Sequence, residues 1–228
     1  WALNGISLYH SPDDGSHWNK IMPKGFIYVY SIGTGSDGSL LAGMLDSMHH
    51  VVAARTSDGG KSWKLSTPLS RGNSIDFIGE AGPGKIIAID DEGYCHRSGD
   101  NGKTWKVVQT SFQPTSLYSI CIVDSLTFYT GAQGGFSVSH DGGISWKPQT
   151  LPLSSTVVTS IAPVSDGSVL AVFDTTRIVH STDGGKSWTD ENIGFFPGTK
   201  ITGLIAVSRG RTSRGAMSGT YTHSNAMG

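Results

Sequence analysis

One eight-residue motif occurs five times along this chain, and its last residue is always tryptophan. The copies cover residues 11–18, 56–63, 98–105, 139–146 and 181–188, and we call them boxes 1 to 5. Successive tryptophans are 41 to 45 residues apart. A period of this size is typical of repeat architectures, so the chain should fold as a series of similar units.

Each period contains four short β-like runs, named A to D in chain order, which are rich in Val, Ile, Tyr and Phe and bounded by Gly, Asp and Ser. Four antiparallel strands in about 42 residues is the arithmetic of a propeller blade. The A runs are residues 26–32, 75–79, 117–123, 157–163 and 201–207. The B runs of the same periods are residues 40–44, 86–89, 128–131, 169–173 and 216–219. A proline lies between each D run and the next A run, where it ends the strand: Pro23, Pro68, Pro114, Pro152 and Pro197.

We therefore predict an all-β fold, a β-propeller of four-stranded antiparallel blades in which residues 1–228 form one domain. Five boxes favour five blades. Additional B-like and C-like runs at both ends of the chain leave six blades, two of them incomplete, as the alternative. Run 201–207 could complete the first blade of a five-blade ring.

The composition excludes several classes of protein. The net charge is −1 and the basic residues are not grouped, so nothing indicates nucleic-acid binding. No apolar run is long enough to span a membrane. Cys95 and Cys121 lie in strand-like runs, where two buried thiols are favoured over a disulfide. No ligand spacing indicates a metal, including at the adjacent His49 and His50, and we expect no cofactor.

The chemistry of the boxes favours a structural role. The third residue is an aspartate that can accept bonds from N–H groups of its own turn, and the glycine two residues later permits positive φ. Small hydroxyl side chains can join the ends of the turn, and the tryptophan can enter the gap between sheets. One consistent carboxylate per box is too few for calcium. The residues given this role are Asp13, Trp18, Asp58, Trp63, Asp100, Trp105, Asp141, Trp146, Asp183 and Trp188.

The motif resembles the Asp-box, or BNR, repeat found in sialidase-like propellers and in photosystem II assembly/stability factors. The resemblance implies that the boxes lie between the third and fourth strands, on the face away from the binding site. It also implies an extracytoplasmic or organelle-lumen location.

Function is then expected on the opposite face, in the B–C turns and the D–A linkers. The candidate binding residues there are Asp46, Arg71, Asp91, Asp174, Phe195 and Phe196. The aromatic platform that a sugar site needs would have to come from Tyr28, Tyr30, Tyr118 or Phe195.

These features favour a non-catalytic scaffold that binds a protein, because compact blades without insertions resemble the assembly factors. One alternative is a glycoside hydrolase of sialidase-like or endoglucanase-like type, using a carboxylate pair from Asp46, Asp91 and Asp174. The arginine clamp and the start motif of sialidases are missing. The other alternative is a glycan-binding lectin.

A basic residue precedes most boxes and is expected to pack its stem over a neighbouring tryptophan rather than to bind a ligand. These residues are His10, Arg55, Arg97, His180 and His223, with Val138 as the exception.

Overall fold

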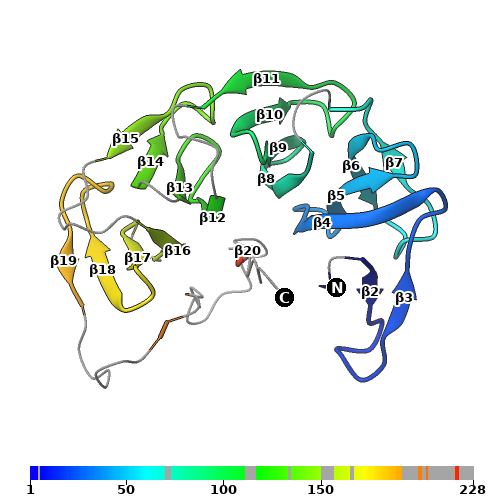
Figure 1. Ribbon diagram of the computed structural model, residues 1–228, viewed down its shortest axis with the longest axis horizontal. Helices are drawn as coiled ribbons and strands as arrows, with labels where there is room; N and C mark the ends of the chain where they lie inside the picture. Colours follow the sequence, from blue (N-terminus) through cyan, green and yellow to red (C-terminus); the bar gives the residue numbers. More distant parts are fainter. Residues whose placement is uncertain are drawn as a thin grey trace, which may run out of the picture. The chain divides into compact units, whose positions relative to one another are not determined.

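The computed structural model describes residues 1–4, 6–69, 73–110, 117–132, 135–149, 157–164, 167–191, 200–201, 204 and 219–220. Every regular element in these residues is a β-strand, and the strands form five antiparallel sheets (Figure 1). The predicted fold class is confirmed: the chain is an all-β, five-blade β-propeller. It divides into two compact units, Trp1–Thr110 and Ser111–Gly228.

The first unit contains three blades. Blade 1 consists of β1 (Ala2–Leu3), β2 (Leu8–His10) and β3 (Asn19–Ile21). Blade 2 consists of β4 (Phe26–Thr34), β5 (Leu40–Asp46), β6 (Val51–Thr56) and β7 (Lys64–Leu65). Blade 3 consists of β8 (Ile75–Gly82), β9 (Lys85–Asp90), β10 (Tyr94–Ser98) and β11 (Lys106–Gln109).

The second unit contains two blades. Blade 4 consists of β12 (Leu117–Ile122), β13 (Phe128–Ala132), β14 (Gly135–Ser139) and β15 (Lys147–Gln149). Blade 5 consists of β16 (Val158–Pro163), β17 (Val169–Phe173), β18 (Arg177–Ser181) and β19 (Thr189–Asp190). Within each of these five blades, consecutive strands pair with one another, because short turns join antiparallel strands.

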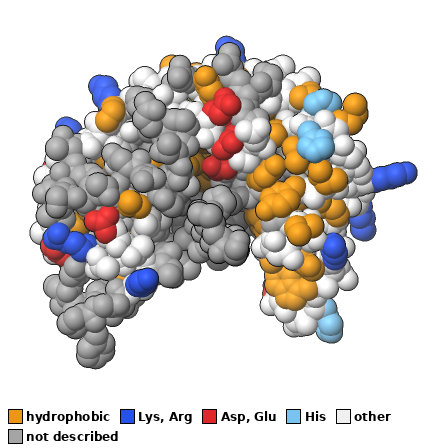
Figure 2. Space-filling model, viewed as in Figure 1, with side chains coloured by type: hydrophobic (Ala, Val, Ile, Leu, Met, Phe, Trp, Pro, Cys, Tyr) orange, Lys and Arg blue, Asp and Glu red, His pale blue; other side chains and the backbone are white. Residues whose placement is uncertain are grey.

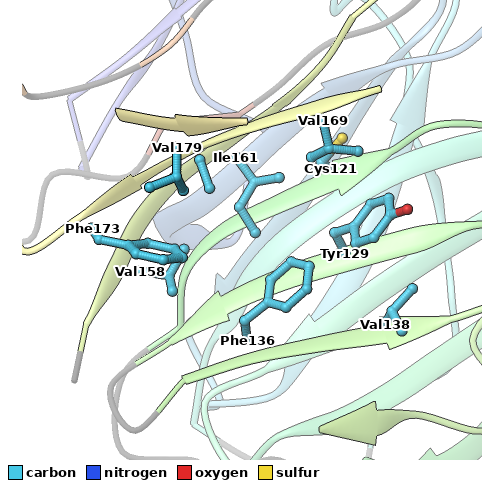
Figure 3. Close-up of a cluster of buried hydrophobic side chains, with 10 residues drawn as sticks. Cys121, Tyr129, Phe136, Val138, Val158, Ile161, Val169, Phe173 and Val179 are labelled. Atoms are coloured by element: carbon cyan, nitrogen blue, oxygen red, sulfur yellow. The ribbon is translucent and has the colours of Figure 1, made fainter. Parts of the chain in front are cut away.

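The core consists of apolar layers between neighbouring blades. Figure 3 shows the layer between blades 4 and 5, where side chains from β13 and β14 meet side chains from β16 and β17. A similar cluster joins blades 2 and 3, and another joins blades 1 and 2. Full burial of one large apolar side chain contributes about 1.5–3 kcal/mol to stability. Because these side chains are buried only where two blades meet, each blade depends on its neighbours for its stability.

The ends of the chain depart from a regular repeat. Blade 1 has three strands and lacks an A strand among its described residues. Of the predicted B run 216–219, Gly219 belongs with Thr220 to β20 (Gly219–Thr220), which pairs with β12 at the edge of blade 4. Of the predicted run 201–207, only Ile201 and Leu204 are described. Leu204 donates its N–H to Ser160 of blade 5.

Both cysteines are buried free thiols, as predicted. Burial raises the pKa of each thiol to about 12, which keeps both protonated at neutral pH. The part of the chain that the structure describes contains no helix long and apolar enough to cross a membrane.

Candidate functional site

The boxes form turns that are closed by hydrogen bonds between neighbours in the sequence. In box 2, the Thr56 hydroxyl donates to Asp58 at 2.8 Å and accepts from the N–H of Gly60 at 2.9 Å. Asp58 also accepts from the N–H of Ser62, and the Trp63 indole donates to the Gly60 carbonyl at 3.1 Å. The corresponding four bonds recur in boxes 1, 3 and 5, and the first three in box 4.

These bonds stabilise the ionised aspartates. The Thr104 hydroxyl, followed by the N–H of the same residue, lowers the pKa of Asp100 to about 2. Ser187 lowers the pKa of Asp183 to about 2 in the same order. Each of these aspartates accepts hydrogen bonds from groups of its own turn. This geometry indicates that the aspartate stabilises the turn rather than acting as a catalytic group.

The tryptophans of the boxes differ in burial. Trp63, Trp105 and Trp188 pack partly buried against the layers between blades, and Trp146 is 7% exposed. Trp18 is 48% exposed, so the predicted insertion between sheets does not hold for box 1. Box 1 belongs to the three-stranded blade, as expected of a terminal repeat.

The basic residue before box 2 joins two blades. Arg55 donates to Ser39 at 2.9 Å and to Asp37 at 2.6 Å, and it also bonds Asn101 of box 3. These contacts of Arg55 are polar, unlike the predicted packing over a tryptophan. The prediction holds for His10, whose ring centroid lies 4.3 Å from that of Trp1. His180 has a related contact, with its Nε2 2.7 Å from the Ser168 hydroxyl.

The three aspartates proposed for binding all stabilise turns. Asp46 is the last residue of β5 and accepts from the N–H groups of Met48 and His50 at 2.8 Å. Its turn partner Ser47 donates its N–H to Gly25, which joins this turn to the start of β4.

Asp91 and Asp174 each lie one residue beyond a B strand and anchor the segment before the A strand of the same blade. Asp91 accepts from the N–H groups of Asn73 and Ser74, and Asp174 accepts from that of Val157. The other three candidates, Arg71, Phe195 and Phe196, lie outside the described residues.

The A strands share a feature that the sequence did not reveal: each has a one-residue bulge at the same register. The register shifts between Val29 and Ser31 in β4, and at the corresponding point in β8, β12 and β16. A bulge redirects one side chain out of the regular alternation, and bulges are common beside binding sites. The bulged residues of blades 2 to 5 are Tyr30, Asp76, Tyr118 and Thr159.

The bulges of blades 2 and 3 lie together. The Ser31 hydroxyl donates to the Ile75 carbonyl at 2.7 Å, so Tyr30 and Asp76, which adjoin these two residues, occupy one region. The rings of Tyr28 and Tyr30 are 4.7 Å apart and tilted by 43°. A second bulge, between Phe26 and Tyr28, precedes them in the same strand.

Two carboxylates adjoin this pair of rings. The Ser74 hydroxyl donates to Asp76 at 2.7 Å and its N–H donates to Asp91 at 3.2 Å. Burial raises the pKa of Tyr30, and the negative charges around it, including those of Asp91 and Asp76, raise it further. Tyr28, Tyr30, Asp76 and Asp91 therefore form one aromatic and acidic region, which we call the Tyr–Asp surface.

Exposed apolar side chains lie at and beside the Tyr–Asp surface. Ile27 is 45% exposed, Tyr28 36% and Met48 74%, and all three lie at the same end of blade 2. Figure 2 shows hydrophobic side chains gathered over β4 and β5, with acidic side chains over blade 3. Exposed apolar groups that gather in this way mark binding sites on many proteins.

The sequence identified three of the four residues of this surface, but in separate contexts. Tyr28 and Tyr30 were candidates for an aromatic platform, and Asp91 was a turn candidate. Asp76 was missed, because a single inserted residue in a strand leaves no mark in composition. Counting back from the boxes does not find it either, because Tyr30 lies 26 residues before box 2 (56 − 30) whereas Asp76 lies 22 residues before box 3 (98 − 76).

Comparison with known proteins agrees with the fold. A family model described as the DUF6242 beta propeller domain matches residues 90–227. The photosystem II assembly lipoprotein Ycf48 of Synechococcus sp. (strain CC9902) is 24% identical over 197 residues, which cover 82% of this chain and 56% of the relative.

Solved structures show the same likeness. The structure "YCF48 bound to D1 peptide" has a TM-score of 0.61 at 19% identity and covers 80% of this chain and 59% of its own. An ancestral GH74 enzyme has a TM-score of 0.64 at 18% identity, over 81% of this chain and 28% of that one. At such identities the likeness concerns the fold alone. The chain spans between half and two thirds of the length of the two Ycf48 relatives.

Proposed function

This chain belongs to the family of DUF6242 β-propeller domains. From this premise we propose that it is a non-catalytic scaffold, which binds a segment of a partner protein on its Tyr–Asp surface. The observation that carries the proposal is the pair of neighbouring bulges at Tyr30 and Asp76, together with the Tyr28 ring, which lies 4.7 Å from that of Tyr30. The names of the relatives, an assembly lipoprotein and a propeller bound to a peptide, favour the same class of function.

The chemistry of the surface favours a basic segment. Aromatic faces attract the cations of Lys and Arg, and nearby carboxylates strengthen such binding. Asp76 and Asp91 supply two negative charges beside Tyr28 and Tyr30, and Ile27 adds exposed apolar area. An extended segment with alternating basic and apolar residues fits this combination.

The boxes have a separate role in this proposal. We infer that they are Asp-box repeats whose aspartates hold turns, because every box shows bonds within four residues of the sequence. The turn bonds of Asp46, Asp91 and Asp174 likewise favour binding over hydrolysis, since each carboxylate accepts from backbone N–H groups of the fold.

Selection from a phage-displayed library of random peptides tests the proposal. We expect enrichment of sequences with Lys or Arg beside apolar residues, and weaker binding at higher ionic strength. Asp76→Asn should lower the affinity for the selected peptide by about tenfold, which is the change expected for the loss of one charge-assisted contact. Tyr30→Ser should weaken it at least as much. Isothermal titration calorimetry measures both.

Asp14→Asn is the matched control, because Asp14 is an exposed carboxylate in box 1 whose positive φ of 54° suits asparagine. It should leave affinity unchanged. Equal losses in Asp14→Asn and Asp76→Asn would contradict the proposal, as would binding to a glycan array that is lost in Tyr30→Ser while no peptide is selected.

A further inference from the structure

The layer between blades 2 and 3 contains a cavity of about 390 Å³ on the side of the boxes. Its apolar lining includes Leu41 and Ala53 of blade 2 and Ile78 and Ile86 of blade 3. The box 3 tryptophan, Trp105, forms part of the wall. All of these residues belong to the first unit.

The corresponding layer between blades 4 and 5 is filled by aromatic rings. The Phe136 ring stacks on Tyr129 with centroids 5.4 Å apart and meets the edge of Trp188 at 5.3 Å. Figure 3 shows the side chains of Phe136 and Tyr129 in the apolar layer with Ile161. Phe136 and Tyr129 are each 3% exposed.

Strand register identifies the residues that replace these rings. Leu40 pairs with the first residue of box 2, and Phe128 pairs with the first residue of box 4. Counted from these pairs, Leu41 corresponds to Tyr129, and Ala53 corresponds to Phe136. Blade 2 therefore lacks both rings of blade 4. Leu41 is 1% exposed and fills its own position, and the cavity lies beside Ala53, at the position of the Phe136 ring.

The glycines of the boxes confirm the difference in packing. A Cβ built on Gly185 of box 5 would lie 2.7 Å from the Phe136 ring of the preceding blade. A Cβ built on Gly102 of box 3 would meet only Ile86 and Trp105, both of its own blade, within 4 Å. Among the described residues, no side chain of blade 2 takes the place of Phe136.

The rim of the cavity is positively charged. Arg55, Lys64 and Lys103 line it, and Asp37 is the single carboxylate among its described lining residues. Asp37 is already paired with Arg55 at 2.6 Å. The ammonium groups of Lys64 and Lys103 therefore lie beside the apolar lining of the cavity. This combination suits a ligand that has an anionic group attached to an apolar ring.

We propose that this cavity binds an aromatic carboxylate, with the ring in the position that Phe136 fills in the other unit and the carboxylate at Lys64 and Lys103. The ring lies against Trp105, as Phe136 lies against Trp188. The source is either a free aromatic acid or the last residue of a polypeptide, because both present the same group. This site is independent of the Tyr–Asp surface.

Titration with N-acetyl-phenylalanine and with its amide tests the charge requirement. The acid should bind about tenfold more tightly than the amide, the ratio expected for a charge-assisted contact. The indole N–H resonance of Trp105 should shift on binding. Binding of 3-phenylpropionate and of a short peptide ending in free phenylalanine then distinguishes the two sources, and binding of either supports the proposal.

Lys64→Gln with Lys103→Gln should remove the preference for the acid. Lys147→Gln with Lys186→Gln is the matched control, because these lysines occupy the corresponding strand and box positions around the filled layer. The control should bind as the wild type does. Equal affinity for acid and amide in the wild type would overturn the proposal.

Ala53→Phe should fill the cavity from within, abolish binding and raise the thermal unfolding temperature. The variant carries the residue that the chain itself uses at this register in blade 4. If it folds and still binds the acid, the assignment of the cavity is wrong. If it does not fold, the two pairs of lysine variants decide the question alone.

Discussion

At the scale of the residue, the aspartates of the boxes link stability to pH. Hydrogen bonds within each turn hold the pKa of Asp100 and Asp183 at about 2, against an ordinary value of 3.8. The bonds that Ser62 donates place the pKa of Asp58 well below its usual range. Bonds of this kind are stronger when the accepting carboxylate is ionised than when it is protonated.

The lowered pKa values give a prediction for acid unfolding. Because the folded pKa lies below the unfolded one, these aspartates stabilise the fold fully above pH 4, and the stabilisation is lost as the pH falls toward 2. The free energy of unfolding, measured with urea at a series of pH values, should therefore decline through this interval. Asp183→Asn should make the free energy of unfolding decline less steeply between pH 4 and pH 2. An unchanged dependence on pH would contradict the role of Asp183 in stabilising its turn.

Single residues explain why the boxes were predictable. Their bonds join residues at most four positions apart, so the sequence contains both partners of every bond. The same holds for Asp46 and its turn. Asp91 differs, since its partners Asn73 and Ser74 are 18 and 17 residues away and only the folded blade reveals them.

At the scale of the element, serines that follow the bulges join one A strand to the next. Ser31 donates to Ile75 of β8, and Ser119 accepts from the N–H of Ile161 of β16. Ser160 accepts from the N–H of Leu204, which belongs to no strand. All three serines are buried, and each stands directly after the bulged residue. The first two bonds fix the separation of neighbouring A strands.

Removing one of these bonds should therefore weaken a layer between blades. Ser31→Ala leaves a buried carbonyl without its hydroxyl donor and should lower the free energy of unfolding by about 1–2 kcal/mol. Urea unfolding measures the change. Ser36→Ala is the control, because Ser36 is exposed in the adjoining turn. An equal loss of stability in both variants would show that the bond from Ser31 to Ile75 does not stabilise the layer.

Elements also mark the limit of prediction from sequence. The extents of the central strands followed from alternating apolar residues and turn residues, and β17 was placed at its exact bounds, Val169–Phe173. The bulges did not follow, because Tyr30 and Asp76 fit a regular strand equally well in sequence. Register exists only between two strands, so it appears when the partner strand is known.

At the scale of the whole molecule, similar blades produce different surfaces. Because the blades repeat, each position in one blade has a counterpart in the others. The residue that occupies the position then determines the local chemistry. The bulge position is Tyr30 in blade 2 and Asp76 in blade 3, and the layer position is Ala53 in blade 2 and Phe136 in blade 4. The sequence alone could not reveal the cavity, because an alanine in a strand is unremarkable until its counterpart is identified.

The central claim is that partner proteins bind the Tyr–Asp surface while the boxes serve the fold. Hydrogen–deuterium exchange of the chain with and without the selected basic peptide tests it most directly. We predict slower exchange in β4, Phe26–Thr34, and in residues 74–76 and 91–94, with boxes 2 and 3 unchanged. Slower exchange in the boxes with β4 unchanged would contradict the claim.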